Sequence, residues 1–369
     1  MEKLIELEDI VLIPSETNMG RIDESKINYV VKDENDKSDN GSLPIFTAPL
    51  ESIVGHGNVG DFMRKGIRPI LPLYEDLNTR LKYCTQIFCS FTMQEIKDNF
   101  IAGANTLTQY NCQYHVCIDA CNGNDKAVID MGLTLKKIYS AQIVLMGGNI
   151  GCPETYGDYS RSGFDFVRVG IANSSLTDTE KVGFTYPMAS LLEGIKIYRK
   201  SSGMGLPKKT KVIADGGILT PLDAIKAIAL GADYVMAGRM FADCLESNGT
   251  IYQRSKNPNT GKQDFSAIDP DTLKGKNKYQ LITSGYSRQY HGNMNPEVRA
   301  FWAGYSNVEE WIKSNPKSKV SDTGWEWINV ERTLDDFLED FRHCTYLHFV
   351  MSNARDWKQF RETSRYARR

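Results

Sequence analysis

Eight short apolar segments recur between residues 43 and 238 of this 369-residue chain, and helical patterns fill most of the gaps between them. Most of the segments are near-continuous apolar runs, which is typical of strands buried on both faces of a parallel sheet. A strand followed by a helix, repeated eight times, favours a closed (β/α)8 barrel over an open doubly wound sheet. The expected strands are 43–50, 67–73, 86–91, 114–120, 143–148, 166–170, 211–217 and 234–238.

The predicted fold class is therefore α/β, a (β/α)8 TIM barrel formed by residues 1–369 as a single domain. An open Rossmann sheet is the alternative, but no G-x-G-x-x-G opens a helix in this chain. The basic C-terminal pentapeptide, 365–369, is expected to be a solvated tail. The expected helices are 95–102, 126–139, 154–162, 187–200, 221–230 and, after the barrel, 334–350.

A long polar excursion follows the eighth strand. Residues 249–325 are rich in Asn, Lys, Gly, Ser and Pro, and they separate that strand from the last helix. Such a segment at the catalytic end of a barrel is usually a lid or substrate loop. We expect an inserted loop or flap over the carboxyl ends of the strands, with residues 249–285 mobile when no ligand is bound. A surface insertion without function is the alternative.

Composition excludes several kinds of partner. The formal net charge is −2, and no basic run interleaved with aromatics is present, so we expect no nucleic-acid partner. No stretch of 18 apolar residues occurs and no apolar leader follows the first residues, which predicts a cytoplasmic protein without a membrane partner. Eight cysteines without a CxxC pair or a His/Cys cluster predict reduced thiols and no metal site.

The run from Lys211 to Met240 has the pattern of a phosphate-binding device. A β-branched strand ends in Asp-Gly-Gly, a helix follows with Thr220 as N-cap and Pro221 at its first position, and a second short strand ends at Gly238. Glycine lets backbone N–H groups approach an anion closely, and a helix N-terminus adds a favourable dipole. This is the usual phosphate site of such barrels. A tight turn without a ligand is the alternative.

Polar or glycine-rich residues follow the other strands as well. The loop 172–179 is rich in hydroxyl groups, which suit ligand oxygens, and a carboxylate such as Asp215 can accept two hydrogen bonds from a ribose diol. At these positions the chain resembles the IMP dehydrogenase / GMP reductase family, from about residue 7 to residue 360. The matching motifs, in order, are Asp9–Ser15, Leu43–Leu50, Asp119–Gly123, Gly148-Asn149, Arg168–Ile171, Tyr186-Pro187, Asp215–Gly217 and Tyr290–Gly292.

The resemblance implies roles for individual residues. A nucleotide 5′-phosphate and its ribose would bind at one set of residues, and the nicotinamide end of NAD(P)(H) at another. The substrate-binding candidates are Ser175, Asp215, Gly216, Gly217, Gly238, Arg239, Tyr290 and Gly292. The cofactor-binding candidates are Asp119, Asn122, Gly123, Asn149 and Gly170. A surface ion pair is the alternative role for Arg239.

The resemblance also implies ligands and assembly. The substrate would be a purine nucleoside monophosphate, the cofactor NAD(P)(H) with NADPH favoured, and a monovalent cation is a further candidate. The absence of room after the second strand for a regulatory CBS pair places the chain nearer to the reductase branch. A homotetramer is expected on the same ground.

One departure concerns the family's catalytic loop, which reads G-x-G-S-x-C-T-T and forms a covalent bond to the purine through its cysteine. Here Thr177 stands at that position, and the basic residue just beyond is replaced by Glu180. Threonine is a poor nucleophile without an adjacent base. The catalytic candidates are therefore Thr177, Thr179, Asp178 as a base, Cys152 as another thiol, and Glu297 near the position of the reductase glutamate.

Three functions remain open on the sequence alone. The first is an oxidoreductase acting on a purine nucleotide through another thiol or without a covalent step. The second is a nucleotide-binding relative without catalysis, and the third is a different reaction on the same scaffold. Asp119, Asn149 and Thr179 favour an enzyme, because a simple binding protein would not need them. Cys152 has an inert packing role as its alternative.

Overall fold

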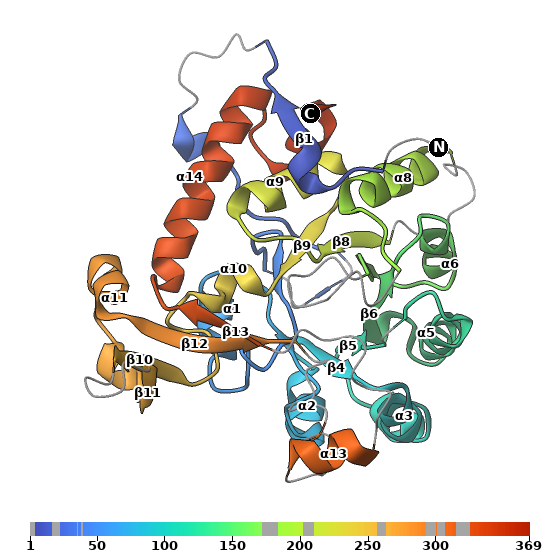
Figure 1. Ribbon diagram of the computed structural model, residues 1–369. Helices are drawn as coiled ribbons and strands as arrows, with labels where there is room; N and C mark the ends of the chain where they lie inside the picture. The colour runs from blue at the N-terminus through green and yellow to red at the C-terminus, as the bar shows by residue number, and fades with distance from the viewer. Residues whose placement is uncertain are drawn as a thin grey trace.

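The computed structural model describes residues 4–16, 23–34, 36–37, 40–120, 122–171, 184–201, 210–256, 263–292, 300, 307–314 and 325–369. Within these ranges, eight parallel strands form one sheet in the order β2-β9-β8-β7-β6-β5-β4-β3. The two outer strands of this order meet through the bridge between Phe46 and Arg68, which closes the sheet. Figure 1 shows the helices arranged around these strands. The (β/α)8 barrel expected from the sequence is confirmed.

All eight expected strands are present, most of them shortened by one to a few residues. β3 is the shortest because Pro69 and Pro72 flank it, and proline has no N–H to donate to a neighbouring strand. The barrel strands are β2 (Ile45–Thr47), β3 (Ile70–Leu71), β4 (Phe88–Phe91), β5 (Tyr114–Ile118), β6 (Ile143–Ile150), β7 (Phe166–Val169), β8 (Lys211–Asp215) and β9 (Tyr234–Ala237).

The six expected helices are also present. The helix expected at 95–102 is α3 (Met93–Glu95) continued by a π-helix, Ile96–Ile101. Two short helices that the sequence pattern does not signal, α1 (Val59–Arg64) and α2 (Leu77–Tyr83), complete the alternation. The other helices of the barrel and C-terminal region are α4 (Ala104–Leu107), α5 (Lys126–Tyr139), α6 (Thr155–Arg161), α8 (Met188–Ser201), α9 (Pro221–Leu230), α10 (Arg239–Ala242), α14 (Leu334–Ser352) and α15 (Trp357–Thr363), with 3-10 turns at Leu7–Asp9, Glu24–Lys26 and Ser140–Gln142.

The N-terminus of α9 has the capping expected from the sequence. The Thr220 side chain accepts a hydrogen bond from the backbone N–H of Asp223, the Asp223 carboxylate accepts from the N–H of Thr220, and Pro221 occupies the first turn. This capping box fixes the point at which the chain turns from β8 into the helix. Among the described helices, none combines the length and the apolar character needed to cross a membrane.

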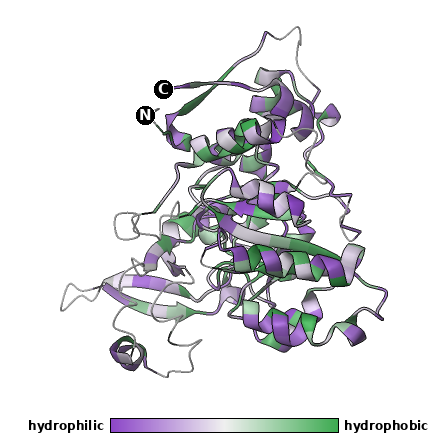
Figure 2. Ribbon diagram, turned by 90° about the vertical axis from the view of Figure 1, so that its right-hand side faces the viewer, coloured by the Kyte–Doolittle hydropathy of each residue, from purple (hydrophilic) through white to green (hydrophobic). Residues whose placement is uncertain are grey.

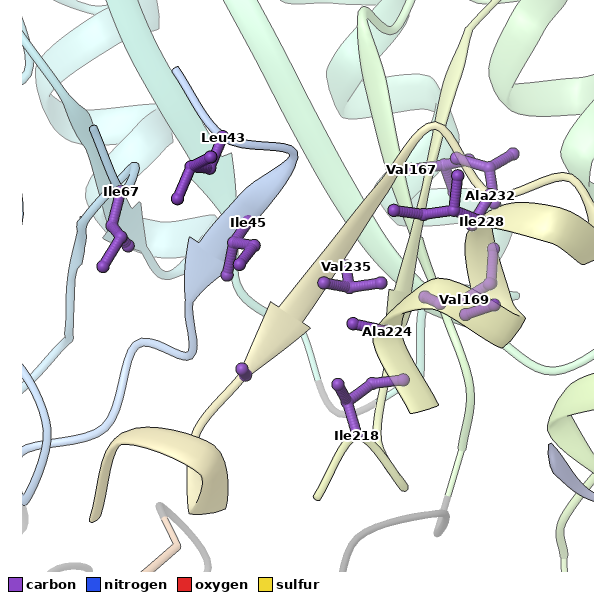
Figure 3. Packing of buried hydrophobic residues seen from close by; sticks show 14 of the residues in the cluster. Leu43, Ile45, Ile67, Val167, Val169, Ile218, Ala224, Ile228, Ala232 and Val235 are labelled. Atoms are coloured by element: carbon purple, nitrogen blue, oxygen red, sulfur yellow. The ribbon is translucent and has the colours of Figure 1, made fainter. Parts of the chain in front are cut away.

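The core has two layers. Inside the barrel, the rings of Phe46, Phe88, Phe166 and Tyr234 meet edge to face with centroids 5.4–5.9 Å apart. Between the strands and the surrounding helices, apolar side chains such as Val235 of β9 point toward α9 (Figure 3). The helices carry both hydrophobic and hydrophilic residues (Figure 2), as expected of elements with one buried face.

The excursion after β9 contains a sheet, where a loop was expected from its composition. Four antiparallel strands pair in the order β11-β10-β12-β13, and the sheet extends from one side of the barrel (Figure 1). One face is buried through residues such as Ile251 and Ile328, which explains why a largely polar segment forms strands. A lid role stays a prediction. The elements are β10 (Ile251–Lys256), β11 (Gln263–Ile268), a 3-10 turn (Pro270–Leu273), α11 (Lys278–Ser284), β12 (Tyr286–His291), α13 (Val308–Ser314) and β13 (Trp325–Asn329).

The two ends of the chain pair with each other. β1 (Ile10–Ile13) runs antiparallel to β14 (Arg365–Arg368), with Ile10 opposite Arg368. The expectation of a solvated C-terminal tail is therefore wrong. Backbone hydrogen bonds to β1 hold a segment whose own side chains are too polar to signal a strand.

The barrel interior gives a stability prediction. Phe166→Ala should lower the free energy of unfolding by about 3–5 kcal/mol, because the ring is fully buried and contacts three other rings. Urea unfolding followed by circular dichroism measures the change. Ile197→Ala on α8 is the control, since that side chain is 66% exposed and should cost less than about 0.5 kcal/mol. Equal losses for the two variants would contradict this account of the core.

Candidate functional site

Four polar side chains lie at the carboxyl ends of neighbouring barrel strands. Asp119 directly follows β5, Asn149 is on β6, Arg168 is on β7 and Asp215 ends β8. The carboxyl ends of the strands in a (β/α)8 barrel share one face, which is where such barrels keep their active sites. We refer to these four residues as the barrel-mouth cluster.

Direct contacts join the cluster in pairs. The Arg168 guanidinium donates through Nη2 to Asp119 Oδ1 at 3.1 Å. The Asn149 amide donates through Nδ2 to Asp215 Oδ2 at 2.8 Å and to the carbonyl oxygen of Gly170 at 2.9 Å. The carboxylate after β5 is thus held by a side chain of β7, and the carboxylate of β8 by a side chain of β6, so each contact spans one intervening strand.

Arg168 is the charge on which the cluster depends. Its side chain is only 4% exposed. Burial opposes its charge, but the thiol of Cys117 and the carboxylates of Asp119 and Asp215 outweigh burial and raise the pKa of Arg168. Burial likewise raises the pKa of Asp215, whereas Arg168 and Asn149 act in the opposite direction. A permanent cation therefore contacts Asp119 and acts on Asp215, opposing the rise that burial causes in the pKa of Asp215.

Two atoms of this cluster have unused hydrogen-bonding capacity. Asp119 Oδ2 and Arg168 Nε are buried and have no hydrogen-bond partner among the described residues. Buried polar atoms in native proteins nearly always have a hydrogen-bond partner. An acceptor without one at a strand end is therefore a place where an N–H or O–H group of a ligand fits.

Glycines follow β8 and β9 at the same face. Gly216 and Gly217 have φ angles of +105° and +72°, a backbone conformation that residues with a side chain rarely adopt. A Cβ at Gly238 would lie 2.7 Å from the hydroxyl of Tyr290, so a side chain is excluded there too. Tyr290 belongs to β12, so the excursion sheet reaches the glycines. Its hydroxyl accepts from the Arg239 amide, and burial raises the pKa of Tyr290.

The remaining substrate-side candidates have other contacts. Arg239 Nε lies 3.9 Å from Glu326 Oε2, and both side chains are more than one third exposed, so the surface ion pair considered as the alternative is the arrangement present. A phosphate role for Arg239 stays a proposal. Gly292 directly follows β12.

On the cofactor side, glycines allow neighbouring loops to pack closely. A Cβ at Gly123 would lie 2.6 Å from Gly148 Cα, and one at Gly170 would lie 2.3 Å from the carbonyl oxygen of Asp215. The Asn122 side chain accepts from the backbone N–H of Asn124 at 3.0 Å and so shapes its own turn.

Cys152, the alternative thiol, lies just past β6 and is half-buried. Its Sγ is 2.8 Å from Thr155 Oγ1 and 3.5 Å from Asn124 Oδ1. The structure thus places this thiol among polar side chains of the β6–α6 turn. The other catalytic candidates, Thr177, Asp178, Thr179 and Glu297, lie outside the described residues together with Ser175, and their roles stay predictions.

Arg168 is the member of the cluster to which the sequence assigned no role beyond a motif match. The sequence did contain a sign of its importance, because Arg168 is the one charged residue inside the apolar strand Phe166–Val169. A buried charge in a strand requires an oppositely charged partner. Asp119 and Asp215, at the ends of other strands, are two such partners for Arg168.

The cluster gives a prediction with a pH dependence. Arg168→Met should lower the free energy of unfolding at pH 7 by about 3–5 kcal/mol, because two buried carboxylates lose their cation. The folded-state pKa of Asp215 is already raised and should rise further, so the folded state binds a proton more readily than the unfolded chain. Stability of the variant should therefore recover as the pH falls through that raised pKa.

Chemical unfolding at several pH values measures this effect. Arg161→Met is the matched control, since the Arg161–Asp158 pair is 53% and 52% exposed and should contribute about 0–1 kcal/mol without recovery in acid. A loss in Arg168→Met that does not change with pH would contradict the proposed charge balance.

Comparison with known proteins identifies the family to which the chain belongs. A family model described as the IMP dehydrogenase / GMP reductase domain matches residues 87–290, more than half of the chain. An inosine-5′-monophosphate dehydrogenase of Chlorobaculum parvum is 35% identical over 156 residues, covering 42% of this chain and 30% of the relative. A GMP reductase of Clostridium acetobutylicum is 27% identical over 269 residues, covering 69% and 75%.

GMP reductase 1 of Homo sapiens is 32% identical over 141 residues, covering 38% of this chain and 39% of the relative. The chain spans about a third of the length of the dehydrogenase and three quarters of that of the clostridial reductase. On the extent of the family match, the chain belongs to the IMP dehydrogenase / GMP reductase family.

Proposed function

We propose that this chain is an oxidoreductase-type enzyme that binds a purine nucleoside 5′-monophosphate and NAD(P)(H) at the carboxyl ends of the barrel strands. The observation that carries the proposal is the barrel-mouth cluster beside the glycines that follow β8 and β9. Relatives in the same family are named for IMP dehydrogenation and GMP reduction.

The phosphate would bind at the backbone N–H groups of Gly216, Gly217 and Gly238, which carry no side chain of their own to stand between the backbone and the anion. Ser175 would add a hydroxyl, and Tyr290 would border the same place. Asp215 would then hold the ribose, since one of its oxygens already accepts from Asn149 and a carboxylate has further acceptor capacity.

The residues on the other side of the cluster fit a nicotinamide. Asp119 Oδ2 is a buried acceptor with no partner in the described part of the chain, and a carboxamide N–H is a suitable donor for it. Arg168 donates to the other oxygen, Oδ1, and so leaves Oδ2 as the acceptor for the ligand. The bound cofactor would supply or accept the hydride. NADPH as the cofactor, a monovalent cation and a homotetramer are further parts of the proposal, on the family resemblance alone.

The chemistry would not follow the family's covalent route unchanged. Thr177 stands where that route needs a thiolate, and a threonine hydroxyl is negligibly ionised at neutral pH. The same substitution favours the second candidate function, a nucleotide-binding relative without catalysis. Cys152 is the thiol through which a relocated covalent step would run.

Nucleotide affinity tests the binding half of the proposal. GMP or IMP should bind at least about tenfold more tightly than its nucleoside, because charge-assisted bonds to the phosphate are lost without it. Gly238→Ala should remove most of this advantage, since the new Cβ would displace the Tyr290 hydroxyl.

Isothermal titration calorimetry measures both effects. Gly57→Ala is the control, because a Cβ there would meet no atom within 4 Å. Equal affinities for nucleotide and nucleoside would contradict the phosphate site.

Activity tests the chemical half. We expect NADPH oxidation with GMP, and NAD reduction with IMP, to be absent or very weak, with little rescue by Thr177→Cys because Glu180 still replaces the basic residue. Spectrophotometric assay of nicotinamide absorbance at 340 nm is the measurement. Robust turnover by the unmodified protein would overturn this expectation. Turnover that Cys152→Ser abolishes without loss of nucleotide binding would assign the nucleophile to Cys152.

A further inference from the structure

A second polar cluster lies at the same face of the barrel, around Glu51 in the loop after β2. The hydroxyl of Tyr74, from the loop after β3, donates a hydrogen bond to the Glu51 carboxylate. His291, the last residue of β12, places Nε2 3.9 Å from Glu51 Oε2. Three segments far apart in the sequence thus converge on one carboxyl group, and we call these residues the Glu51 cluster.

Backbone contacts hold this cluster in place. The Asn248 side chain donates to the carbonyl oxygen of Glu51 at 2.8 Å, and the Ser52 hydroxyl lies 3.4 Å from the carbonyl oxygen of His291. The Glu51 side chain is 26% exposed and that of His291 is 19% exposed. The pair is therefore fixed between barrel and excursion sheet, and it remains in contact with solvent.

The Glu51 cluster borders the proposed nucleotide site. A Cβ at Gly238 would lie 3.1 Å from Leu50 Cδ1 and 2.7 Å from the Tyr290 hydroxyl. Glu51 and His291 are the next residues in these two segments. A carboxylate repels phosphate, whereas it attracts the N–H and protonated groups of a nucleobase. With the phosphate at the glycines after β8 and β9, the base is the part of the nucleotide that fits beside Glu51.

The other titratable groups nearby already have partners. Glu75 accepts from the backbone N–H of His56 at 2.8 Å, and its second oxygen lies 2.8 Å from His56 Nδ1. Burial, with a smaller contribution from the charge of Glu75, raises the pKa of Glu51 despite the Tyr74 hydrogen bond. A carboxyl group of this kind can carry a proton closer to neutral pH than an exposed glutamate.

We propose that Glu51 and His291 are an acid–base pair that contacts the base of the bound nucleotide, with Tyr74 as a positioning residue. The inference rests on the proposed function, because it takes its substrate from there. When the base binds, the Glu51 carboxyl takes up a proton and donates it in a hydrogen bond to a ring nitrogen or carbonyl oxygen of the base. The proton comes from solvent, to which both side chains are exposed, and the His291 ring, 3.9 Å from the carboxylate, offers a second polar contact to the base; one proton therefore enters the complex for each nucleotide bound.

Proton exchange on binding tests this inference. Calorimetric titrations of the full chain with IMP, in two buffers of different ionisation enthalpy, give the number of protons exchanged; ribose 5-phosphate, which has no base, is titrated in parallel. In the unmodified protein we expect about one more proton to be taken up with IMP than with ribose 5-phosphate, whose phosphate exchanges protons of its own because its second pKa is about 6. Glu51→Gln should reduce the uptake with IMP to the value found with ribose 5-phosphate. Glu51→Gln and His291→Gln should each weaken IMP binding about tenfold, the loss of one hydrogen bond to a charged group, while ribose 5-phosphate binding stays the same.

Glu75→Gln is the matched control, since Glu75 is a neighbouring carboxylate with its own partner. It should keep the exchange. Tyr74→Phe should keep it as well but move its pH dependence. Unchanged proton uptake in Glu51→Gln, or unchanged IMP affinity in both Glu51→Gln and His291→Gln, would overturn the inference and leave the proposed function standing. Failure of both IMP and ribose 5-phosphate to bind the unmodified protein would overturn the proposed function, and the inference with it.

Discussion

A guanidinium buried between two carboxylates is the interaction on which the barrel mouth depends. Arg168 on β7 contacts Asp119 after β5 and lies in the field of Asp215 at the end of β8. Without a cation, two acidic groups would be costly to bury at the mouth of an apolar barrel. With it, two acceptors remain in a largely apolar barrel, which is the condition for binding the hydroxyl and amide donors of nucleotides.

The excursion sheet completes this face from outside the barrel. Arg288 of β12 is fully buried and donates to the carbonyl oxygens of Cys244 and Leu245, just after α10. This anchor places the end of the same strand against the barrel, with Tyr290 beside Gly238 and His291 beside Glu51. The sheet therefore contributes side chains to the mouth even where its own surface is polar.

Much of the barrel was predictable because its signals are local. The apolar runs identified all eight strands, and the Thr220–Pro221 pair identified the start of α9. The excursion sheet and the β1–β14 pair were not predictable in this way. Their strands are short and mostly polar, so they lack the apolar pattern of a buried strand. They are held by pairing between residues far apart in the sequence, such as Ile10 and Arg368, which no local pattern indicates.

The candidate site likewise has a part that the sequence predicts and a part that it does not. The positions of Asp119, Asn149 and Asp215 followed from strand ends, and the structure brings them together. The ion pair of Arg239 with Glu326 and the contact of Glu51 with His291 depend on where the excursion folds back, and spacing along the chain carries no such information.

The most direct test of the central claim is a crystal structure of the chain with GMP and NADPH. The account predicts the 5′-phosphate within hydrogen-bond distance of the backbone N–H groups at Gly216, Gly217 and Gly238, and the ribose hydroxyls on Asp215. A nucleotide bound elsewhere on the barrel, or one whose phosphate lies away from these glycines, would contradict it.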